Sequence, residues 1–160
     1  IGILDAIAAV RGAGGPPLLV KIAPDLADDA LGPLVEACAG RGVAGLIVSN
    51  TTIARPESLR SAHRAETGGL SGPPVFARST AMLRSLHRLA QGRLALVGVG
   101  GVASGEHAYA KIRAGAAVVQ LYTGFAYGGP ALIPRIKAEL AALLRRDGFA
   151  NVADAVGRDA

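Results

Sequence analysis

Four short apolar runs, each followed by a longer segment of helical character, constrain the fold of this 160-residue chain more than any other feature. The runs lie at residues 18–22, 46–48, 94–98 and 117–124, and the last of them ends in polar and small residues. The segments that follow predict helices at about residues 28–39, 75–90, 105–114 and 130–146, and a further helix at 1–11 precedes the first run. Continuously apolar strands that alternate with helices are typical of a parallel sheet covered on both faces.

Two architectures fit such a sheet: an open three-layer sheet, and half of an eight-stranded barrel, which as a whole needs about 250 residues. In both, functional residues follow the carboxyl ends of the strands. No glycine fingerprint follows the first run, which argues against a dinucleotide-binding fold. The chain is therefore predicted to be an α/β protein, the carboxyl-terminal half of a (β/α)8 TIM barrel, at residues 1–146, with a polar tail at 147–160. Because the sequence opens mid-helix and without Met, we expect the natural chain to start upstream.

Composition and charge exclude several classes of function. The formal charge is +5, but the basic residues are dispersed and no aromatic residues alternate with them, so no nucleic-acid partner is predicted. The single cysteine, Cys38, cannot form an intrachain disulfide and is expected in the core. No apolar run approaches the roughly 18 residues of a spanning helix. His63, His87 and His107 have no metal-ligand spacing, so they are read as surface or helix-face residues and no metal site is predicted.

Polar and glycine-rich motifs follow the strands. They are, in order, VKIAPDL at 20–26, SNTT at 49–52, GGLSG at 68–72, GVGG at 98–101 and QLYTG at 120–124. Glycine lets the main chain approach a ligand closely and exposes N–H groups to an anion. In such barrels the loops after the last two strands often hold a phosphate. The motifs therefore favour a phosphate cradle, although each glycine taken singly is also compatible with a plain tight turn.

These five motifs, in this order and spacing, resemble the carboxyl-terminal half of dihydroorotate dehydrogenases of the quinone-dependent, membrane-associated class (class 2). The resemblance covers nearly the whole of residues 1–146. It implies bound FMN, with the cofactor contacted by Lys21, Ser49, Gly72, Gly101, Tyr122 and Thr123. It implies that the substrate is bound by Asn50 and Thr51.

The chemistry of these residues suits the implied roles. A lysine beside the flavin pyrimidine edge would stabilise the anion of the reduced flavin, and an asparagine amide can donate and accept hydrogen bonds along a pyrimidine edge. Ser49 stands where the family usually has threonine, and it keeps the hydroxyl. From pattern alone, Lys21 is also compatible with a lysine that extends from a strand end, and Asn50–Thr51 with a turn or helix cap.

By resemblance, the reaction oxidises dihydroorotate to orotate in de novo pyrimidine biosynthesis, with hydride transfer to FMN and reoxidation by a quinone. The family's catalytic base is a serine in the amino-terminal half, which this sequence lacks, and neither Ser71 nor Ser104 lies in the matching motif. The membrane-docking helices also belong to that half, and they imply a peripheral position on the cytoplasmic face of a bacterial membrane. We therefore expect residues 1–160 alone to be inactive, and to aggregate or dimerise.

Two alternatives remain open. One is another FMN or phosphate-ligand barrel enzyme, such as a sugar-phosphate isomerase, which would have no use for Lys21 together with Asn50–Thr51. The other is a non-catalytic phosphate-binding half barrel that assembles with a second copy.

Overall fold

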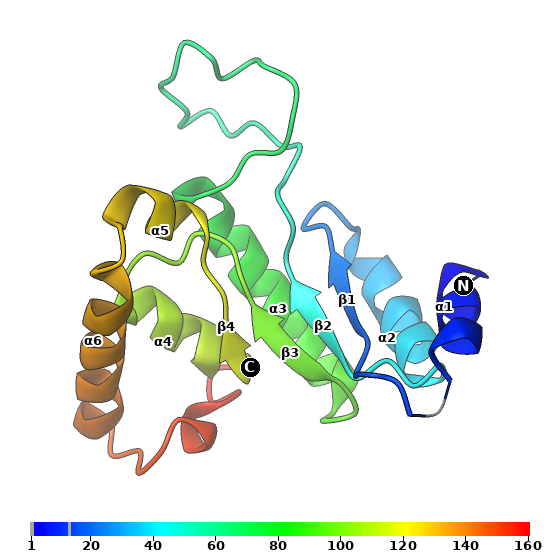
Figure 1. Ribbon diagram of the computed structural model, residues 1–160. Helices are drawn as coiled ribbons and strands as arrows, with labels where there is room; N and C mark the ends of the chain where they lie inside the picture. The colour runs from blue at the N-terminus through cyan, green and yellow to red at the C-terminus, as the bar shows by residue number, and fades with distance from the viewer. Residues whose placement is uncertain (1, 13) are drawn as a thin grey trace.

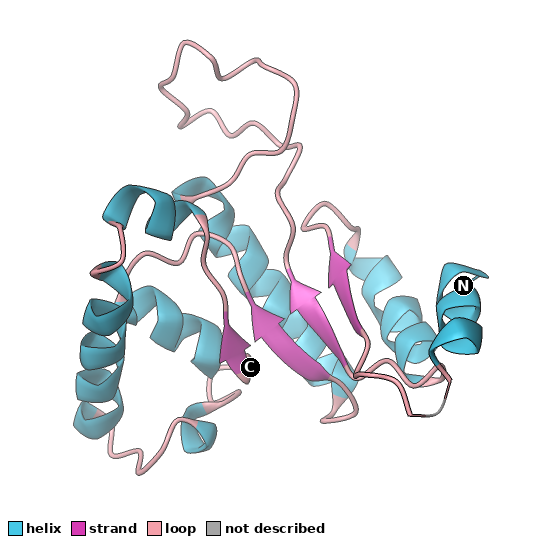
Figure 2. Cartoon of the chain, viewed as in Figure 1, coloured by secondary structure: helices cyan, strands magenta, loops and turns pink. Residues whose placement is uncertain are grey.

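A parallel sheet forms the centre of the molecule. The computed structural model describes residues 2–12 and 14–160. The strands follow chain order across the sheet, and every neighbouring pair is parallel: β1 (Leu19–Ile22), β2 (Gly45–Val48), β3 (Ala95–Gly98) and β4 (Val118–Val119). The connecting helices lie on one side of this sheet (Figures 1 and 2): α2 (Leu31–Ala39), α3 (Phe76–Ala90) and α4 (Gly105–Arg113). The predicted order of strands and helices is confirmed.

The two faces of the sheet differ in burial because successive side chains point to opposite faces. Ile22, Val48 and Gly98 are paired in register, and the first two are buried against α2 and α3 residues such as Val35 and Leu83. On the opposite face, Lys21, Ile47, Val97 and Val118 form the next row. Lys21 is exposed, and Val118 is 55% exposed. The second face is therefore only partly covered, as expected for the inner wall of an open barrel segment.

Most element bounds lie within two residues of those predicted, and the carboxyl-terminal region differs most. Helix α1 spans Gly2–Arg11 and α6 spans Leu132–Arg146. Only Val118 and Val119 of the fourth run are in strand conformation, paired with Val97 and Gly98 of β3. The chain then forms a short helix that the sequence did not predict, α5 (Thr123–Gly128). Single 3-10 turns complete the elements: η1 (Asp28–Ala30), η2 (Pro73–Val75) and η3 (Ala153–Ala155).

Residues 147–160, expected to be a less determined tail, pack against α4. Ala155 is fully buried beside Tyr109 and Ile112. The backbone N–H of Gly157 donates to the Ile112 carbonyl at 3.1 Å. The hydroxyl of Tyr109 donates to Asp147 Oδ2 at 2.6 Å, and burial, followed by this bond, raises the pKa of Tyr109. The tail therefore contributes to the structure around α4.

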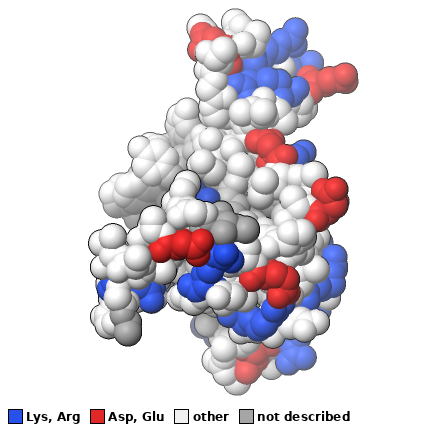
Figure 3. All heavy atoms as spheres, turned by 90° about the vertical axis from the view of Figure 1, so that its right-hand side faces the viewer, with Lys and Arg blue, Asp and Glu red and all other residues white. Residues whose placement is uncertain are grey.

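The long segment between β2 and α3 projects from the body of the molecule as a loop (Figure 1), and both acidic and basic side chains gather on it (Figure 3). An antiparallel bridge between Thr52 and Leu70 closes its base. Arg55 holds the two arms together, because its Nη2 donates to the carbonyls of Glu66 (2.8 Å) and Gly68 (2.7 Å). Among residues 2–12 and 14–160, no helix is both long enough and apolar enough to cross a membrane.

Candidate functional site

A cavity of about 270 Å³ opens at the carboxyl ends of the strands. Its wall contains Lys21 of β1, the segments that follow β2, β3 and β4, and the loop before α3. All eight residues assigned from the sequence line it: Lys21, Ser49, Asn50, Thr51, Gly72, Gly101, Tyr122 and Thr123. The structure thus brings the whole predicted set to one place, although the chain separates its members by up to about a hundred residues.

Lys21 lies on the partly covered face of β1, in register with Ile47 of β2. Its side chain is exposed, and no hydrogen bond or ion pair joins it to another residue of the described part of the chain. Because the side chain is exposed, the lysine needs no buried partner in this part of the chain. Its ammonium group stands at the cavity wall, available to an anionic or carbonyl-rich ligand.

The Ser49–Thr51 loop is fixed by backbone bonds to both neighbouring strand ends. The N–H of Ser49 donates to the Val99 carbonyl at 3.2 Å, and the N–H of Asn50 donates to the Ile22 carbonyl at 2.7 Å. The Ser49 hydroxyl is turned to the Asn50 carbonyl at 2.9 Å. The backbone of Ser49 and Asn50 is therefore held, while the side chains of Asn50 and Thr51 are exposed at the cavity.

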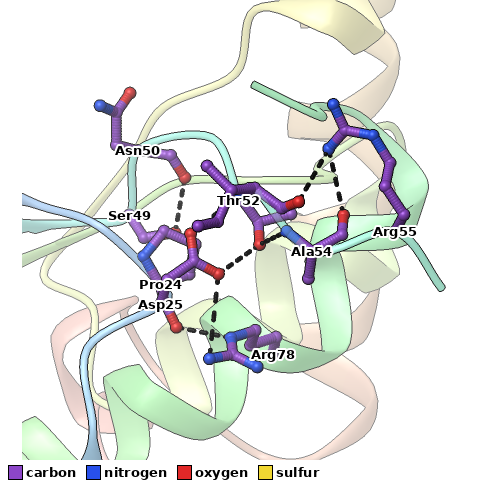
Figure 4. A network of polar contacts seen from close by, with 9 residues as sticks. Pro24, Asp25, Ser49, Asn50, Thr52, Ala54, Arg55 and Arg78 are labelled. Carbon is purple, nitrogen blue, oxygen red and sulfur yellow. Dashed lines mark hydrogen bonds and ion pairs between the residues drawn. The ribbon is translucent and has the colours of Figure 1, made fainter. Parts of the chain in front are cut away.

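A polar network beneath this loop was missed by the sequence reasoning (Figure 4). Thr52 Oγ1 donates to Asp25 Oδ1 at 2.5 Å, and the backbone N–H of Ile53 donates to Asp25 Oδ2 at 3.0 Å. Arg78 Nε of α3 donates to the Pro24 carbonyl at 2.5 Å. The Thr52 hydroxyl is the main reason why the pKa of Asp25 lies below its usual value. Asp25 stands inside one of the quoted motifs, which was the available signal, but its partner is 27 residues away.

Two glycine turns form the opposite wall. Gly72 and Gly101 have φ values of +79° and +73°, in the left-handed region that disfavours other residues. A Cβ on Gly101 would lie 2.5 Å from the Cβ of Phe76, so this turn rests directly on the start of α3. Thr123 Oγ1 donates to Ser71 Oγ at 2.9 Å and ties the start of α5 to the first turn. The result is a main-chain cradle near the amino end of α3, where anions are favoured.

The remaining candidate groups lie elsewhere. His63 pairs with Glu66 in the projecting loop at 2.6 Å, and His107 Nδ1 accepts the N–H of Ala103 at 3.3 Å. Cys38 is buried in the core, as predicted. The described residues contain no group of three or more His, Cys, Asp or Glu side chains arranged to hold a metal ion. Lys21 and Tyr122 are the titratable residues that line the cavity within the described part of the chain.

Comparison with known proteins identifies the family. Residues 3–144 match the family model described as Dihydroorotate dehydrogenase. A protein of Azorhizobium caulinodans named dihydroorotate dehydrogenase (quinone) is 62% identical over 90% of this chain, and a mitochondrial protein of that name from Arabidopsis thaliana is 57% identical over 91%. The matches cover 40% and 32% of those proteins, so the chain spans less than half of their length.

A solved structure agrees in fold. A crystal structure of DHODH in complex with ferulenol, from Eimeria tenella, superposes with a TM-score of 0.88 at 46% identity, covering 91% of this chain and 39% of that one. The predicted partial (β/α)8 barrel is thereby confirmed. Because the family model matches residues 3–144, which are most of this chain, the chain belongs to the dihydroorotate dehydrogenase family.

Proposed function

We propose that this chain forms the FMN-binding part of a quinone-dependent dihydroorotate dehydrogenase, which oxidises dihydroorotate to orotate in pyrimidine biosynthesis. The observation that carries the proposal is the convergence of all eight family-matched residues on one cavity at the carboxyl ends of the strands. A sugar-phosphate isomerase would share the glycine cradle but would have no reason to place Lys21 and Asn50 opposite it.

The residues of the cavity fit FMN at both ends. The turns at Gly72 and Gly101 have positive φ values and line the cavity, so their main-chain N–H groups would be offered to a phosphate beside the amino end of α3. Tyr122 and Thr123 complete this phosphate side. Lys21 and Ser49 line the other end of the cavity, where the flavin ring would lie and where a cation favours an electron-rich pyrimidine edge. Bound there, FMN supplies the hydride acceptor of the reaction.

Asn50 and Thr51 are the substrate-binding residues of this part. Their side chains are exposed at the cavity while the Asn50 main chain is held by the Ile22 carbonyl. An amide fixed in this way donates to a carbonyl and accepts from an N–H of the pyrimidine ring, so it orients the substrate. No carboxylate or imidazole among the described residues lines the cavity. As the family resemblance implies, we assign the base that removes the substrate proton to a serine in the part of the enzyme that this chain does not span, and not to Ser71, which lines the cavity but lies outside the matching motif.

The proposed quinone partner rests on the names of the relatives, and the proposed membrane position follows from the quinone. Quinones dissolve in the bilayer, so an enzyme that reduces them works at its surface. We assign the complete enzyme a peripheral position at the cytoplasmic face of a bacterial membrane, with the contact made outside this chain. Flotation of the full-length gene product with vesicles, compared with residues 1–160 alone, tests this assignment. Binding of the isolated chain as strong as that of the full-length product would contradict it.

The proposal is tested by the absorption spectrum of the purified full-length gene product, before and after anaerobic addition of dihydroorotate. Flavin bands that bleach on addition are the expected result. The Asn50→Ala variant should retain the bands but bleach at least tenfold more slowly, because it loses substrate contacts and keeps the cradle. Bands that persist in the unaltered protein would retain the flavin and reject the substrate. A folded protein without flavin bands would contradict the proposed function.

A further inference from the structure

Lys111 of α4 is a buried cation that the assignments above leave without a role. Its side chain is fully buried, the largest such side chain in the molecule. Its Nζ donates to Ser79 Oγ at 2.6 Å and lies 5.1 Å from the centroid of the Phe76 ring. No carboxylate of the described residues forms an ion pair with it, and burial lowers the pKa of Lys111 to about 7. Because an apolar side chain would fill this space at lower cost, packing alone gives no reason for a lysine here.

The lysine stands directly behind the glycine cradle. Ser79 accepts from Lys111, and its own hydroxyl donates to the Val75 carbonyl at 2.8 Å. A Cβ on Gly100 would lie 2.9 Å from Ser79 Oγ, so the second glycine turn rests on this serine. Val75 and Gly100 both line the cavity. The Lys111–Ser79 pair is therefore one layer of residues behind the wall against which a phosphate would lie.

We propose that Lys111 is the internal counter-charge of the phosphate cradle, a positioning residue that takes up a proton when a phosphate dianion binds and that holds the start of α3 through Ser79. The inference deepens the proposed function and rests on it. A dianion one layer away stabilises the ammonium form, because charges interact strongly where water is excluded. Above neutral pH the unprotonated amine gains its proton from the buffer, and linkage requires that phosphate affinity rises with this protonation.

Other titratable groups on the elements around Lys111 must be separated from it. Strands β3 and β4 carry none. On α3 and α4 they are Arg78, Arg84, His87, Arg88, Glu106, His107, Tyr109 and Arg113. On α6, which packs against α4, they are Arg135, Lys137, Glu139, Arg145 and Arg146, and Glu139 accepts the N–H of Gly105. Arg78 is directed to Pro24, and Arg84 to the Asp159 carbonyl. The Phe76 ring contacts both Lys111 and His107, and the centroids of the Phe76 and His107 rings are 4.5 Å apart. His107 therefore requires its own control.

The test measures proton uptake when flavin-free full-length gene product binds FMN at pH 8. At this pH the FMN phosphate, with a second pKa of about 6, is already a dianion and takes up no proton itself. Calorimetric titration in two buffers of different ionisation enthalpy gives the number of protons taken up. We expect about half to one proton per flavin, because a group with a pKa of about 7 is largely unprotonated at pH 8.

Variants locate the proton. At pH 8, Lys111→Met should lose the uptake and bind FMN about tenfold more weakly, the effect that a rise of about two units in the pKa of the lysine, from about 7 to about 9, has at this pH. Lys137→Met, the same change at an exposed lysine of α6, and His107→Asn should both retain the uptake. Ser79→Ala should also retain the uptake while binding FMN several-fold more weakly, since it removes only the link to α3.

The outcomes distinguish this inference from the proposed function. Undiminished uptake in Lys111→Met, or its loss in His107→Asn alone, would overturn the role of Lys111 and leave the flavin site intact. If Lys111→Met fails to fold, the unaltered protein still decides: FMN binding at pH 8 without proton uptake overturns the inference. Failure of the unaltered, folded protein to bind FMN at all would overturn the proposed function, and this inference with it.

Discussion

Replacing Gly101 with alanine should disrupt the cradle more than its small size indicates. The added methyl meets two separate obstacles. The φ of Gly101 is +73°, which costs an alanine roughly 1–2 kcal/mol. The new Cβ would also lie 2.5 Å from the Cβ and 2.9 Å from the Cα of Phe76, closer than non-bonded contacts of a Cβ atom come in proteins. Both obstructing atoms are close to the main chain of α3 and cannot rotate away.

The expected cost follows from these two terms. Overpacking in a well-packed region costs about 1–3 kcal/mol, so the sum is roughly 2–5 kcal/mol. Gly42 offers a matched control, because its φ is +65° while a Cβ there would meet nothing within 4 Å. Gly42→Ala should therefore cost only the backbone term, roughly 1–2 kcal/mol. The difference between the two variants isolates the contact between the second glycine turn and α3.

Urea unfolding of the full-length gene product measures this difference. We expect Gly101→Ala to lower the unfolding midpoint clearly more than Gly42→Ala, and to weaken flavin binding at least about tenfold because the turn is displaced from the cradle. Gly42 lies at the end of α2, away from the cavity, so its variant should retain flavin. Equal loss of stability in the two variants would refute the close packing of this turn on Phe76.

Three further perturbations test other parts of the structure. The hydrogen bond from Arg146 is the main cause that lowers the pKa of Asp147, so the ionised carboxylate stabilises the fold above its ordinary pKa of 3.8, and this contribution is lost as the pH falls below about 4. In Asp147→Asn the thermal midpoint should therefore depend less on pH between pH 5 and 2 than in the unaltered protein. An unchanged dependence on pH would contradict this. Burial raises the pKa of the Cys38 thiol, so mass spectrometry should find Cys38 unlabelled by iodoacetamide in native protein at pH 8 and labelled in urea. Arg55→Ala removes the bonds to the Glu66 and Gly68 carbonyls, so a glutamate-specific protease should cleave the projecting loop faster than in the unaltered protein. Arg60→Ala, at an exposed position of the same loop, should be cleaved at the rate of the unaltered protein.

The sequence predicted the strands correctly where a continuous apolar run is followed by turn residues. Residues 19–22 and 95–98 became strands almost as predicted, because runs of this kind are stable only between helices and neighbouring strands. Helix α5 was missed because its six residues include two glycines and show no helical period. Its formation depends on the turn that follows β4. The packing of the tail was missed for a related reason, since the bond from Gly157 to Ile112 spans the whole of α6.

Some residues of the candidate site could be predicted from the sequence, and others could not. Residues that line the cavity could be found because strand ends converge at one edge of a parallel sheet, which brings Lys21 and Asn50 together whatever their separation in sequence. The residues that support them could not. Thr52 meets Asp25 across 27 residues, and Lys111 meets Ser79 across 32, through contacts to which local spacing gives no clue. Lys111 in particular stands in an amphipathic helix and is indistinguishable there from a solvated lysine.

Under the proposed function, the contacts of the cavity predict that phosphate binding and turnover depend on different parts of the complete enzyme. On the phosphate side, every support comes from within the chain: Thr123 bonds Ser71, Gly101 rests on Phe76, and the buried Lys111 lies behind them. On the ring side, Lys21 and Asn50 are exposed: Lys21 lies on the partly covered face of β1, and Asn50 lies in the loop after β2. Groups that must be shielded from water to act on a substrate therefore depend on cover from the rest of the enzyme, whereas a main-chain cradle for a phosphate is already closed from behind. Adding the remaining strands should accordingly change turnover far more than it changes the affinity for the phosphate group.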